Sequence, residues 1–382
     1  MKATVPIYDV LIVGAGLSGI GAAYHLQKDC PRKTFAILEG RESIGGTWDL
    51  FRYPGIRSDS DMYTLGFSFN PWKNPKAIAD GPSILQYIKD TASEFGIAPK
   101  IKYNHKVLDA SWSDEDKFWT LSVKAHKDVT QQQMRCRFLF MCSGYYDYDN
   151  GYTPDFPDIS KYEGRVIHPQ HWDEQLDYSE KKVIIIGSGA TAVTLLPEMA
   201  KKADKVYMLQ RTPTYVVTLP SEDPIALSLR KVLPEKDAYQ VIRWKNILIS
   251  MGFYNACKQW PDAIKKIILK GVRRQMGNDY DMRHFDPPYN PWDQRLCVVP
   301  DADLFKAVKS GKAEVVTDHI ERFTQKGILL KSGRTLEADI VVTATGLKVQ
   351  LLGGMTVHIN GKAAKASESH CYKGIMLSNA PN

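Results

Sequence analysis

The sequence has no hydrophobic run long enough to cross a membrane, and its 6 cysteines are scattered without a CxxC pair. A membrane-spanning helix needs about 20 consecutive apolar residues, and disulfide frameworks or zinc sites need cysteines at paired spacings. A signal-peptide pattern is also missing, because the first apolar burst runs directly into a glycine turn. We therefore expect a cytoplasmic protein with reduced thiols and no metal site.

Charge of one sign is not in large excess. The net charge is +7 over 382 residues, 43% of the residues are hydrophobic and 24% are charged. This composition is that of a folded globular protein, and the small positive excess suits an anionic cofactor without requiring nucleic acid, which we do not expect as a partner. A chain of this length exceeds what one hydrophobic core usually supports, which predicts two or more domains.

A glycine turn follows the first predicted strand, residues 9–13. Gly14, Gly16 and Gly19 have the spacing GxGxxG and precede a predicted helix. In such a unit the first glycine permits a tight turn, the second permits close approach of a pyrophosphate, and the third permits close packing of helix and strand. Glu39 ends the next strand, where a carboxylate accepts hydrogen bonds from ribose hydroxyls and repels a 2′-phosphate. The pattern predicts a site for FAD or NAD.

A second unit repeats this order of elements from residue 182 onward. Gly187 and Gly189 follow the predicted strand 183–186, and Ala192 replaces the third glycine. The strand after the helix ends at Arg211 and carries no acid there. A guanidinium at this position pairs with a 2′-phosphate, so the second unit favours NADP.

These repeats predict an α/β fold with two Rossmann-like dinucleotide-binding domains, one for FAD and one for NADPH, and a helical insertion. Alternating residues within 97–129 predict an antiparallel excursion in the first domain. We assign residues 1–150, continued by 347–382, to the FAD-binding domain, residues 151–223 and 286–346 to the NADPH-binding domain, and residues 224–285 to the insertion.

The predicted insertion is helical and basic. Residues 224–277 carry eleven lysines and arginines against three acids, with aromatic residues between them. Two interpretations stay open. The charges are either the solvated face of a helical insertion, or a surface through which a cytoplasmic protein associates peripherally with an anionic membrane. Nucleic acid fits this segment less well.

Three further motifs point to a ligand site. The pair Gly45-Gly46 precedes Thr47-Trp48, and residues 52–59 gather charged and turn residues in a manner typical of an active-site loop. The third motif has the spacing [FY]xGxxxHxxxWD. Two histidines three residues apart, without a further ligand type nearby, do not predict a metal site. Its members are Tyr162, Gly164, His168, Trp172 and Asp173.

Together these motifs resemble the class B flavoprotein monooxygenases of the Baeyer-Villiger type, which the Trp172-Asp173 ending distinguishes from the classical flavin-containing monooxygenases. The stretches 45–62, 187–194 and 289–297 are most similar to the ethionamide-activating subgroup. The resemblance extends over essentially the whole chain. Family members continue past the position of Asn382, so we expect the FAD-binding domain of this chain to stop short of its usual C-terminal part.

The resemblance implies a set of site residues. Arg295 is implied as the catalytic arginine beside the flavin, held by Asp59. FAD contacts are implied at Ser18, Glu39, Thr47, Trp48, Asp49, Leu50, Asp59 and the backbone of Val107, in addition to the glycine turn. NADPH contacts are implied at Arg57, Ser58, Asp59, Ile186, Gly187, Ser188, Gly189, Ala190, Thr191, Ala192, Gln210 and Arg211.

The resemblance also implies an activity, the insertion of one oxygen atom of O₂ into a ketone to give an ester through a C4a-peroxyflavin, with sulfides or thioamides as further substrates. Arg295 would stabilise the negative charge of the oxidant. N- or S-oxygenation and long-chain alkane oxidation stay open as alternatives, as does a nucleotide-binding protein of little activity, shortened at its C-terminus. A disulfide reductase is excluded because Cys30 has no partner cysteine in the first unit.

Overall fold

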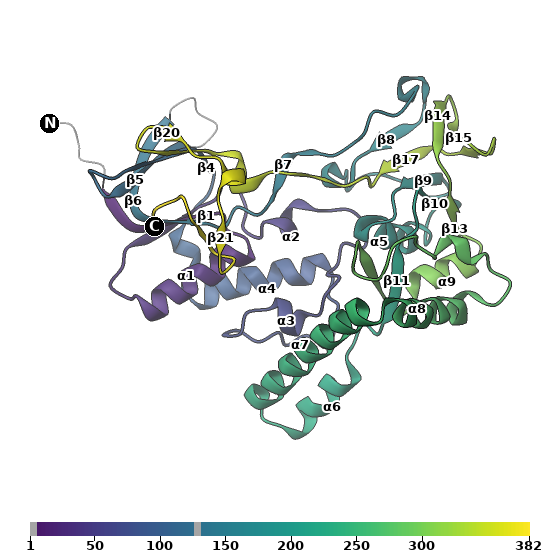
Figure 1. Cartoon of the computed structure of the whole chain (residues 1–382), viewed down its shortest axis with the longest axis horizontal. Coiled ribbons are helices and arrows are strands. Elements are labelled where there is room, and N and C mark those ends of the chain that lie inside the picture. Colours follow the sequence, from purple (N-terminus) through teal and green to yellow (C-terminus); the bar gives the residue numbers. More distant parts are fainter. Residues whose placement is uncertain (1–5, 126–130) are drawn as a thin grey trace. The chain divides into compact units, whose positions relative to one another are not determined.

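The computed structural model describes residues 6–125 and 131–382, which group into two compact units. The first unit combines residues 1–50, 82–150 and 347–382, apart from those outside the described ranges, and the second combines residues 51–81 and 151–346 (Figure 1). The α/β class with two dinucleotide-binding sheets is confirmed. Residues 126–129 of the predicted antiparallel excursion lie outside the described residues.

The first unit is built on a mixed sheet of eight strands in the order β20-β19-β4-β5-β6-β1-β2-β3. β1 pairs in parallel with β2 and β6, whereas β4, β5 and β6 are antiparallel neighbours. The strands are β1 (Ile7–Val13), β2 (Phe35–Leu38), β3 (Ile101–Lys102), β4 (His105–Ser113), β5 (Phe118–Ala125), β6 (Gln131–Met141), β19 (Thr356–Ile359) and β20 (Lys362–Ala363), and the helices are α1 (Leu17–Asp29), α2 (Thr47–Leu50) and α4 (Gly81–Glu94).

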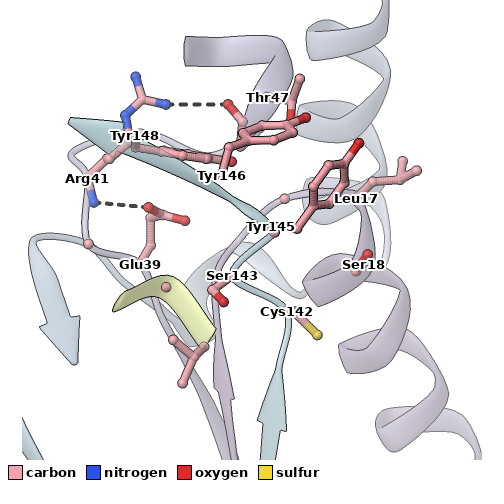
Figure 2. Close-up of a pocket in the computed structure, with 18 of the residues that line it drawn as sticks. Leu17, Ser18, Glu39, Arg41, Thr47, Cys142, Ser143, Tyr145, Tyr146 and Tyr148 are labelled. Atoms are coloured by element: carbon pink, nitrogen blue, oxygen red, sulfur yellow. Dashed lines mark hydrogen bonds between the residues drawn. The ribbon is translucent and has the colours of Figure 1, made fainter. Parts of the chain in front are cut away.

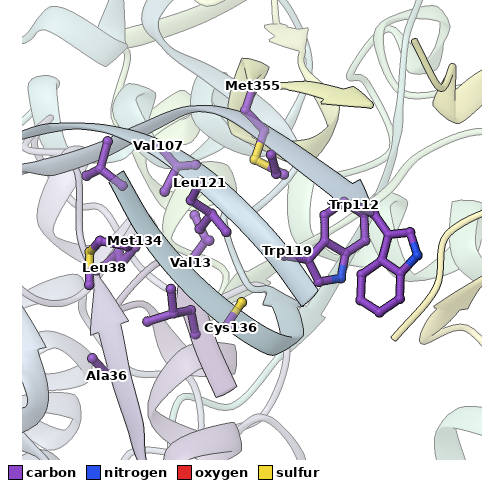
Figure 3. Packing of buried hydrophobic residues seen from close by; sticks show 13 residues of the cluster. Val13, Ala36, Leu38, Val107, Trp112, Trp119, Leu121, Met134, Cys136 and Met355 are labelled. Carbon is purple, nitrogen blue, oxygen red and sulfur yellow. The ribbon is translucent and has the colours of Figure 1, made fainter. Parts of the chain in front are cut away.

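The core of the first unit lies between the parallel strands and the antiparallel excursion (Figure 3). Because side chains alternate along a strand, β5 directs every second residue into this core, and β4 does the same beyond a register shift that follows Val107. Trp112 and Trp119 face each other across these strands with ring centroids 5.6 Å apart. Burial of such large rings stabilises the packing of β4 on β5.

The second unit contains a parallel sheet of five strands in the order β13-β10-β9-β17-β8. Its apolar strands are buried, as expected for a parallel sheet. The strands of this sheet are β8 (Arg165–Ile167), β9 (Lys182–Ile186), β10 (Lys205–Gln210), β13 (Ala313–Thr317) and β17 (Ile340–Thr343). A separate pair is formed by β11 (Tyr215–Leu219) and β12 (Leu296–Pro300). A third, antiparallel sheet is formed by β14 (Ile320–Thr324), β15 (Gly327–Leu330) and β16 (Thr335–Glu337). Helices α5 (Ala190–Met199) and α9 (Asp303–Lys309) belong to the same unit.

The predicted insertion is helical, as expected. It forms α6 (Pro224–Val232), α7 (Glu235–Gln259) and α8 (Pro261–Met276). Asp223 caps α6 by accepting hydrogen bonds from the backbone of Ile225 and Ala226, at 3.0 and 3.1 Å. Prolines at the first position of α6 and α8 set these helix starts. Among the described residues, no helix has the length and apolar character that a membrane span needs.

Residues 51–81, which we assigned to the FAD-binding domain by sequence, group with the second unit by their contacts. They contain α3 (Met62–Leu65), which packs on α7. Arg243 of α7 donates to the carbonyl oxygens of Tyr63, Thr64 and Gly66 at 2.6, 3.2 and 3.2 Å. The backbone of Ala77 also donates to Ser221, at 2.7 Å. These contacts join segments far apart in sequence, which a boundary drawn from motif order does not detect.

We predict that Arg243→Ala destabilises the second unit by about 3 kcal/mol, because it leaves three partly buried carbonyl groups without a charged donor. Thermal unfolding followed by circular dichroism measures the effect. Lys236→Ala on the same helix is the matched control. Because Lys236 is exposed, this variant should unfold at the wild-type temperature. Equal melting temperatures for both variants would contradict the role of Arg243.

Candidate active site

The first glycine turn lies where β1 ends between β2 and β6. The backbone N–H of Gly14 donates to the carbonyl of Leu38 at the end of β2, at 2.8 Å. Gly14 has a φ of +104°, and a Cβ there would lie 2.4 Å from the carbonyl oxygen of Cys142. A Cβ at Gly19 would lie 1.9 Å from the carbonyl oxygen of Gly14. The turn is therefore so closely packed that only glycine fits at these two positions.

A cavity of about 390 Å³ opens above this turn, and every residue that lines it belongs to the first unit. The first turn of α1 borders it, and the N–H groups there have no partner within the helix. Figure 2 shows residues from the glycine turn, the end of β2, the start of α2 and the segment after β6 around this space. Of the predicted FAD contacts, Gly14, Gly16, Ser18, Glu39, Thr47 and Trp48 line the cavity.

Glu39 holds the glycine turn as well as facing the cavity. Its carboxylate accepts hydrogen bonds from the backbone of Ala15, at 2.8 Å, and from that of Arg41, at 3.0 Å. Burial raises the pKa of Glu39 above its usual value, although these two bonds and the Arg41 charge oppose the shift. Each carboxylate oxygen accepts one of the bonds and keeps a further lone pair for a ligand hydroxyl.

Four predicted FAD contacts of the first unit do not line the cavity, in the part of the chain that the structure describes. Gly19 is used for packing against Gly14. Asp49 is buried, accepts a hydrogen bond from Ser43 and forms an ion pair with Arg41 at 2.7 Å. Leu50 ends α2 away from the lining, and the side chain of Val107 lies in the core.

Sequence reasoning missed several lining residues. Tyr145, Tyr146 and Tyr148 follow β6 and face the cavity, with the rings of Tyr146 and Tyr148 stacked 6.1 Å apart (Figure 2). The hydroxyl of Tyr146 lies 3.1 Å from that of Thr47, and burial raises the pKa of Tyr146 to about 12. Arg41 and Lys106 add positive charge to the lining. The position of the tyrosines directly after β6 could have indicated them, because ligands of parallel sheets bind beyond the carboxyl ends of the strands.

The second glycine turn repeats the geometry of the first. Gly187 donates to the carbonyl of Leu209 at the end of β10, at 2.8 Å, and has a φ of +135°. A Cβ at Gly187 would lie 2.3 Å from the carbonyl oxygen of Ala344. Ala192 is fully buried in α5, so its methyl group fits where the first unit requires Gly19. The predicted contacts Ile186, Gly189, Ala190 and Thr191 complete this strand, turn and helix start.

Arg211 lies next to this turn because β10 runs parallel to β9. The hydroxyl of Ser188 donates to the carbonyl of Thr212 at 3.1 Å, which ties the residue after Arg211 to the turn. The guanidinium of Arg211 is exposed and forms no hydrogen bond or ion pair with the described residues. Gln210 instead is buried and donates to the carbonyl of His284 and to Thr317, at 2.7 and 2.9 Å. Its side-chain amide therefore fixes the strand.

Arg295 and Asp59 do not form the predicted pair. Both lie in the described part of the second unit, and both charges act on the buried thiol of Cys297, whose pKa burial raises to about 11. Within that part of the chain, no ion pair joins their side chains. The guanidinium of Arg295 lies over the second glycine turn, where a Cβ at Gly189 would come within 2.7 Å of its Nη1. Arg295 is therefore positioned by the turn, and Asp59 remains exposed.

Arg57 and Ser58 also have protein partners. Arg57 forms an ion pair with Asp303 of α9, and one of its terminal nitrogens is buried without a hydrogen-bond partner among the described residues. Ser58 is buried and accepts a hydrogen bond from the backbone of Ala79 at 3.1 Å. These side chains anchor the loop 52–59, and their contacts with NADPH stay predictions.

The described contacts of the histidine motif are all with other residues of the second unit. Tyr162 donates to the carbonyl of Ala338 at 2.9 Å, and Asp173 pairs with Arg165 at 2.8 Å. The Nε2 of His168 lies 3.2 Å from the carbonyl oxygen of Gly346, and burial lowers the pKa of this imidazole. In the described ranges no group of three His, Cys, Asp or Glu side chains is arranged to hold a metal ion.

Solved structures with this fold include flavoprotein oxygenases. A steroid monooxygenase bound to NADP matches 92% of this chain and 74% of its own, with a TM-score of 0.76 and 21% identity. A cyclohexanone monooxygenase matches 90% of this chain and 74% of its own, with a TM-score of 0.72 and 20% identity. At this identity the likeness describes the fold.

Sequence relatives are much closer. The FAD-containing monooxygenase EthA of Mycobacterium tuberculosis is 56% identical over 98% of this chain and 76% of its own length. EthA of Mycolicibacterium smegmatis is 52% identical over 98% of this chain and 76% of its own length. The model of the NAD(P)-binding Rossmann-like domain matches residues 12–78, and that of the flavin-binding monooxygenase-like family matches residues 66–352. The predicted resemblance is thus confirmed, and the chain belongs to the flavin-binding monooxygenase-like family.

Proposed function

We propose that the protein is an FAD- and NADPH-dependent Baeyer-Villiger monooxygenase, in which the first unit binds FAD and the second binds NADPH. The observation that carries this proposal is the contrast between two equivalent turns. One is followed by the carboxylate of Glu39, and the other by the free guanidinium of Arg211. A carboxylate disfavours a 2′-phosphate, whereas a guanidinium binds it.

The cavity of the first unit fits FAD by the chemistry of its lining. The glycine turn and the start of α1 suit a pyrophosphate, and the free lone pairs of Glu39 suit ribose hydroxyls. Arg41 offers a positive charge beside these groups, and its ion pair with Asp49 holds it in place. The relative EthA is an FAD-containing monooxygenase, which supports the same assignment.

The turn of the second unit fits NADPH. The first-turn N–H groups of α5 and the guanidinium of Arg295 both lie at this turn, where they would bind a pyrophosphate. Arg211 would pair with the 2′-phosphate. The steroid monooxygenase that shares this fold was solved with NADP bound, in line with this assignment.

The overall reaction takes ketone, O₂, NADPH and H⁺ to ester, NADP⁺ and water. Bound FAD supplies the redox chemistry that passes two electrons from NADPH to O₂ and one oxygen atom to the substrate. Arg295 would stabilise negative charge that develops on oxygen during the transfer, because a guanidinium keeps its charge at any physiological pH. Its place over the turn also lets it retain NADP⁺, so that water is kept from the reacting groups.

Ketones are the proposed substrate class. One solved cyclohexanone monooxygenase of this fold has ε-caprolactone bound, the cyclic ester that corresponds to its ketone. Sulfides and thioamides are further proposed substrates, since the same oxidant oxygenates soft nucleophiles. The motif ending Trp172-Asp173 favours the Baeyer-Villiger type over the classical flavin-containing N- and S-oxygenases.

We predict that the protein, supplied with FAD, converts a medium-chain linear ketone to the ester in step with NADPH oxidation. Absorbance of NADPH and gas chromatography of the ester measure the two quantities in the same sample. NADPH oxidation that releases only hydrogen peroxide, with every ketone and sulfide offered, would overturn the oxygenase assignment while leaving both nucleotide sites in place.

Arg295→Ala should separate the two half-reactions. At saturating NADPH, reduction of bound FAD without oxygen should stay within a few-fold of wild type, whereas ester formation should fall by at least about 100-fold, because a charged donor in a transition state contributes this much. Arg322→Ala, an exposed arginine of the same unit, is the control. Ester formation at the wild-type rate in Arg295→Ala would remove Arg295 from the mechanism.

Arg211→Ala should raise the KM for NADPH by about 30-fold, since charge-assisted hydrogen bonds to a phosphate contribute about 2 kcal/mol. The KM for NADH should stay unchanged, because NADH lacks the 2′-phosphate. Initial rates with both nucleotides, again with Arg322→Ala as control, test this. A parallel rise of both KM values would mean that Arg211 acts on the fold of the turn and not on the phosphate.

A further inference from the structure

The net positive charge of the whole chain is located in one helical segment. Residues 224–277 contain eleven basic and three acidic side chains, a net charge of +8, against +7 for all 382 residues. The remainder of the protein is therefore close to neutral. This separation is not explained by the nucleotide sites, because their glycine turns lie outside the segment.

Five of the eleven cations have structural partners. Arg230 and Arg243 donate to backbone carbonyl groups of residues 63–73. Lys245, Lys258 and Lys265 form ion pairs with Asp223, Asp293 and Asp286. The other six are exposed and have no side-chain partner among the described residues; they are Lys231, Lys236, Lys266, Lys270, Arg273 and Arg274.

The exposed side of α7 is apolar in the middle part of the helix. Val241, Trp244, Leu248 and Met251 follow one another at intervals of three and four residues, so they form a single stripe along the helix. Their exposed fractions are 47%, 58%, 61% and 57%. The opposite side of α7 is buried through Ala238, Tyr239, Ile242 and Cys257. The stripe thus faces away from the packed side of its own helix.

Large apolar side chains are concentrated in this segment. Eleven of the 24 large hydrophobic side chains that are exposed in the described part of the chain lie in residues 224–276. Isolated exposed hydrophobic residues are normal on protein surfaces, but a concentration of this kind marks an interaction site. Trp260 at the junction of α7 and α8 and Ile267 on α8 extend it toward the four free cations of α8.

We propose that helices α7 and α8 form a peripheral docking surface for an anionic lipid bilayer. The apolar stripe of α7, with Trp244 and Trp260, enters the interface between headgroups and acyl chains, which tryptophan side chains favour. The free cations of α8 pair with lipid phosphates. Because none of the described helices could cross a bilayer, the protein lies on the surface.

Charge complementarity selects lipid over the other occupants of an apolar stripe. A second copy of the chain would bring two segments of net charge +8 together, and like charges oppose such contact. A nucleic acid would pair with the cations but would leave the aliphatic residues of the stripe in water. An anionic membrane neutralises the cations and buries the stripe at the same time.

Vesicle co-sedimentation of the full-length protein tests the proposal. Vesicles of phosphatidylcholine with phosphatidylglycerol should bind the wild type, and vesicles of phosphatidylcholine alone should bind it much less. Lys266→Glu/Lys270→Glu should lower the partition coefficient by about 30-fold or more, and Leu248→Ser by about tenfold. Lys326→Glu/Lys331→Glu, which removes the same charge from exposed sites outside the segment, is the matched control and should bind like the wild type.

Melting temperatures within a few degrees of wild type establish that each variant is folded, because all substituted side chains are exposed. A blue shift of tryptophan emission on binding, reduced in Trp244→Phe because Trp260 remains, would locate α7 in the interface. Equal losses in the control and α8 variants would overturn the proposal, since binding would then follow net charge alone. Absence of lipid binding, with a dimer in sedimentation velocity that Leu248→Ser dissociates, would assign the stripe to a second copy.

Discussion

The bond from the first glycine of each turn to the end of the neighbouring strand is the constraint on which both nucleotide sites depend. Gly14 donates to Leu38 and Gly187 to Leu209, each at 2.8 Å. Each bond holds the end of the neighbouring strand, β2 in the first unit and β10 in the second, beside the turn. The residue that follows this strand therefore lies next to the turn. In the proposed function, the side chain placed there, Glu39 in one unit and Arg211 in the other, determines which nucleotide fits.

The elements around these turns were predictable because they depend on local rules. The strand 183–186 was predicted within one residue of the observed β9, and residues 224–277 were predicted to be helical, as α6, α7 and α8 are. Of the candidate FAD contacts, Ser18, Thr47 and Trp48 do line the cavity. Glycine spacing, strand length and the position of a polar residue after a strand are all properties of segments shorter than about 40 residues.

Other features depend on contacts between distant segments. Arg57 pairs with Asp303, and Arg295 rests on Gly189, partners separated by about 100 to 250 residues. Arg243 donates to the carbonyl groups around Tyr63 and so helps to hold residues 51–81 in the second unit. By sequence alone, Arg57 and Arg295 were expected beside a cofactor, and Arg243 was expected among the charges of the helical insertion. A guanidinium can donate to a carboxylate, a carbonyl or a phosphate, so its partner is determined by the tertiary fold.

The discontinuity of the first unit has a consequence for synthesis on the ribosome. β19 pairs with β4 through Thr356 and Asp109, so one edge of β4 stays open until the chain has been extended from residue 113 to residue 356. At typical translation speeds this interval is roughly 12 to 50 seconds. An open strand edge is a template for pairing with other chains. The yield of correctly folded protein should therefore depend on elongation rate and on the chaperones that meet the nascent chain.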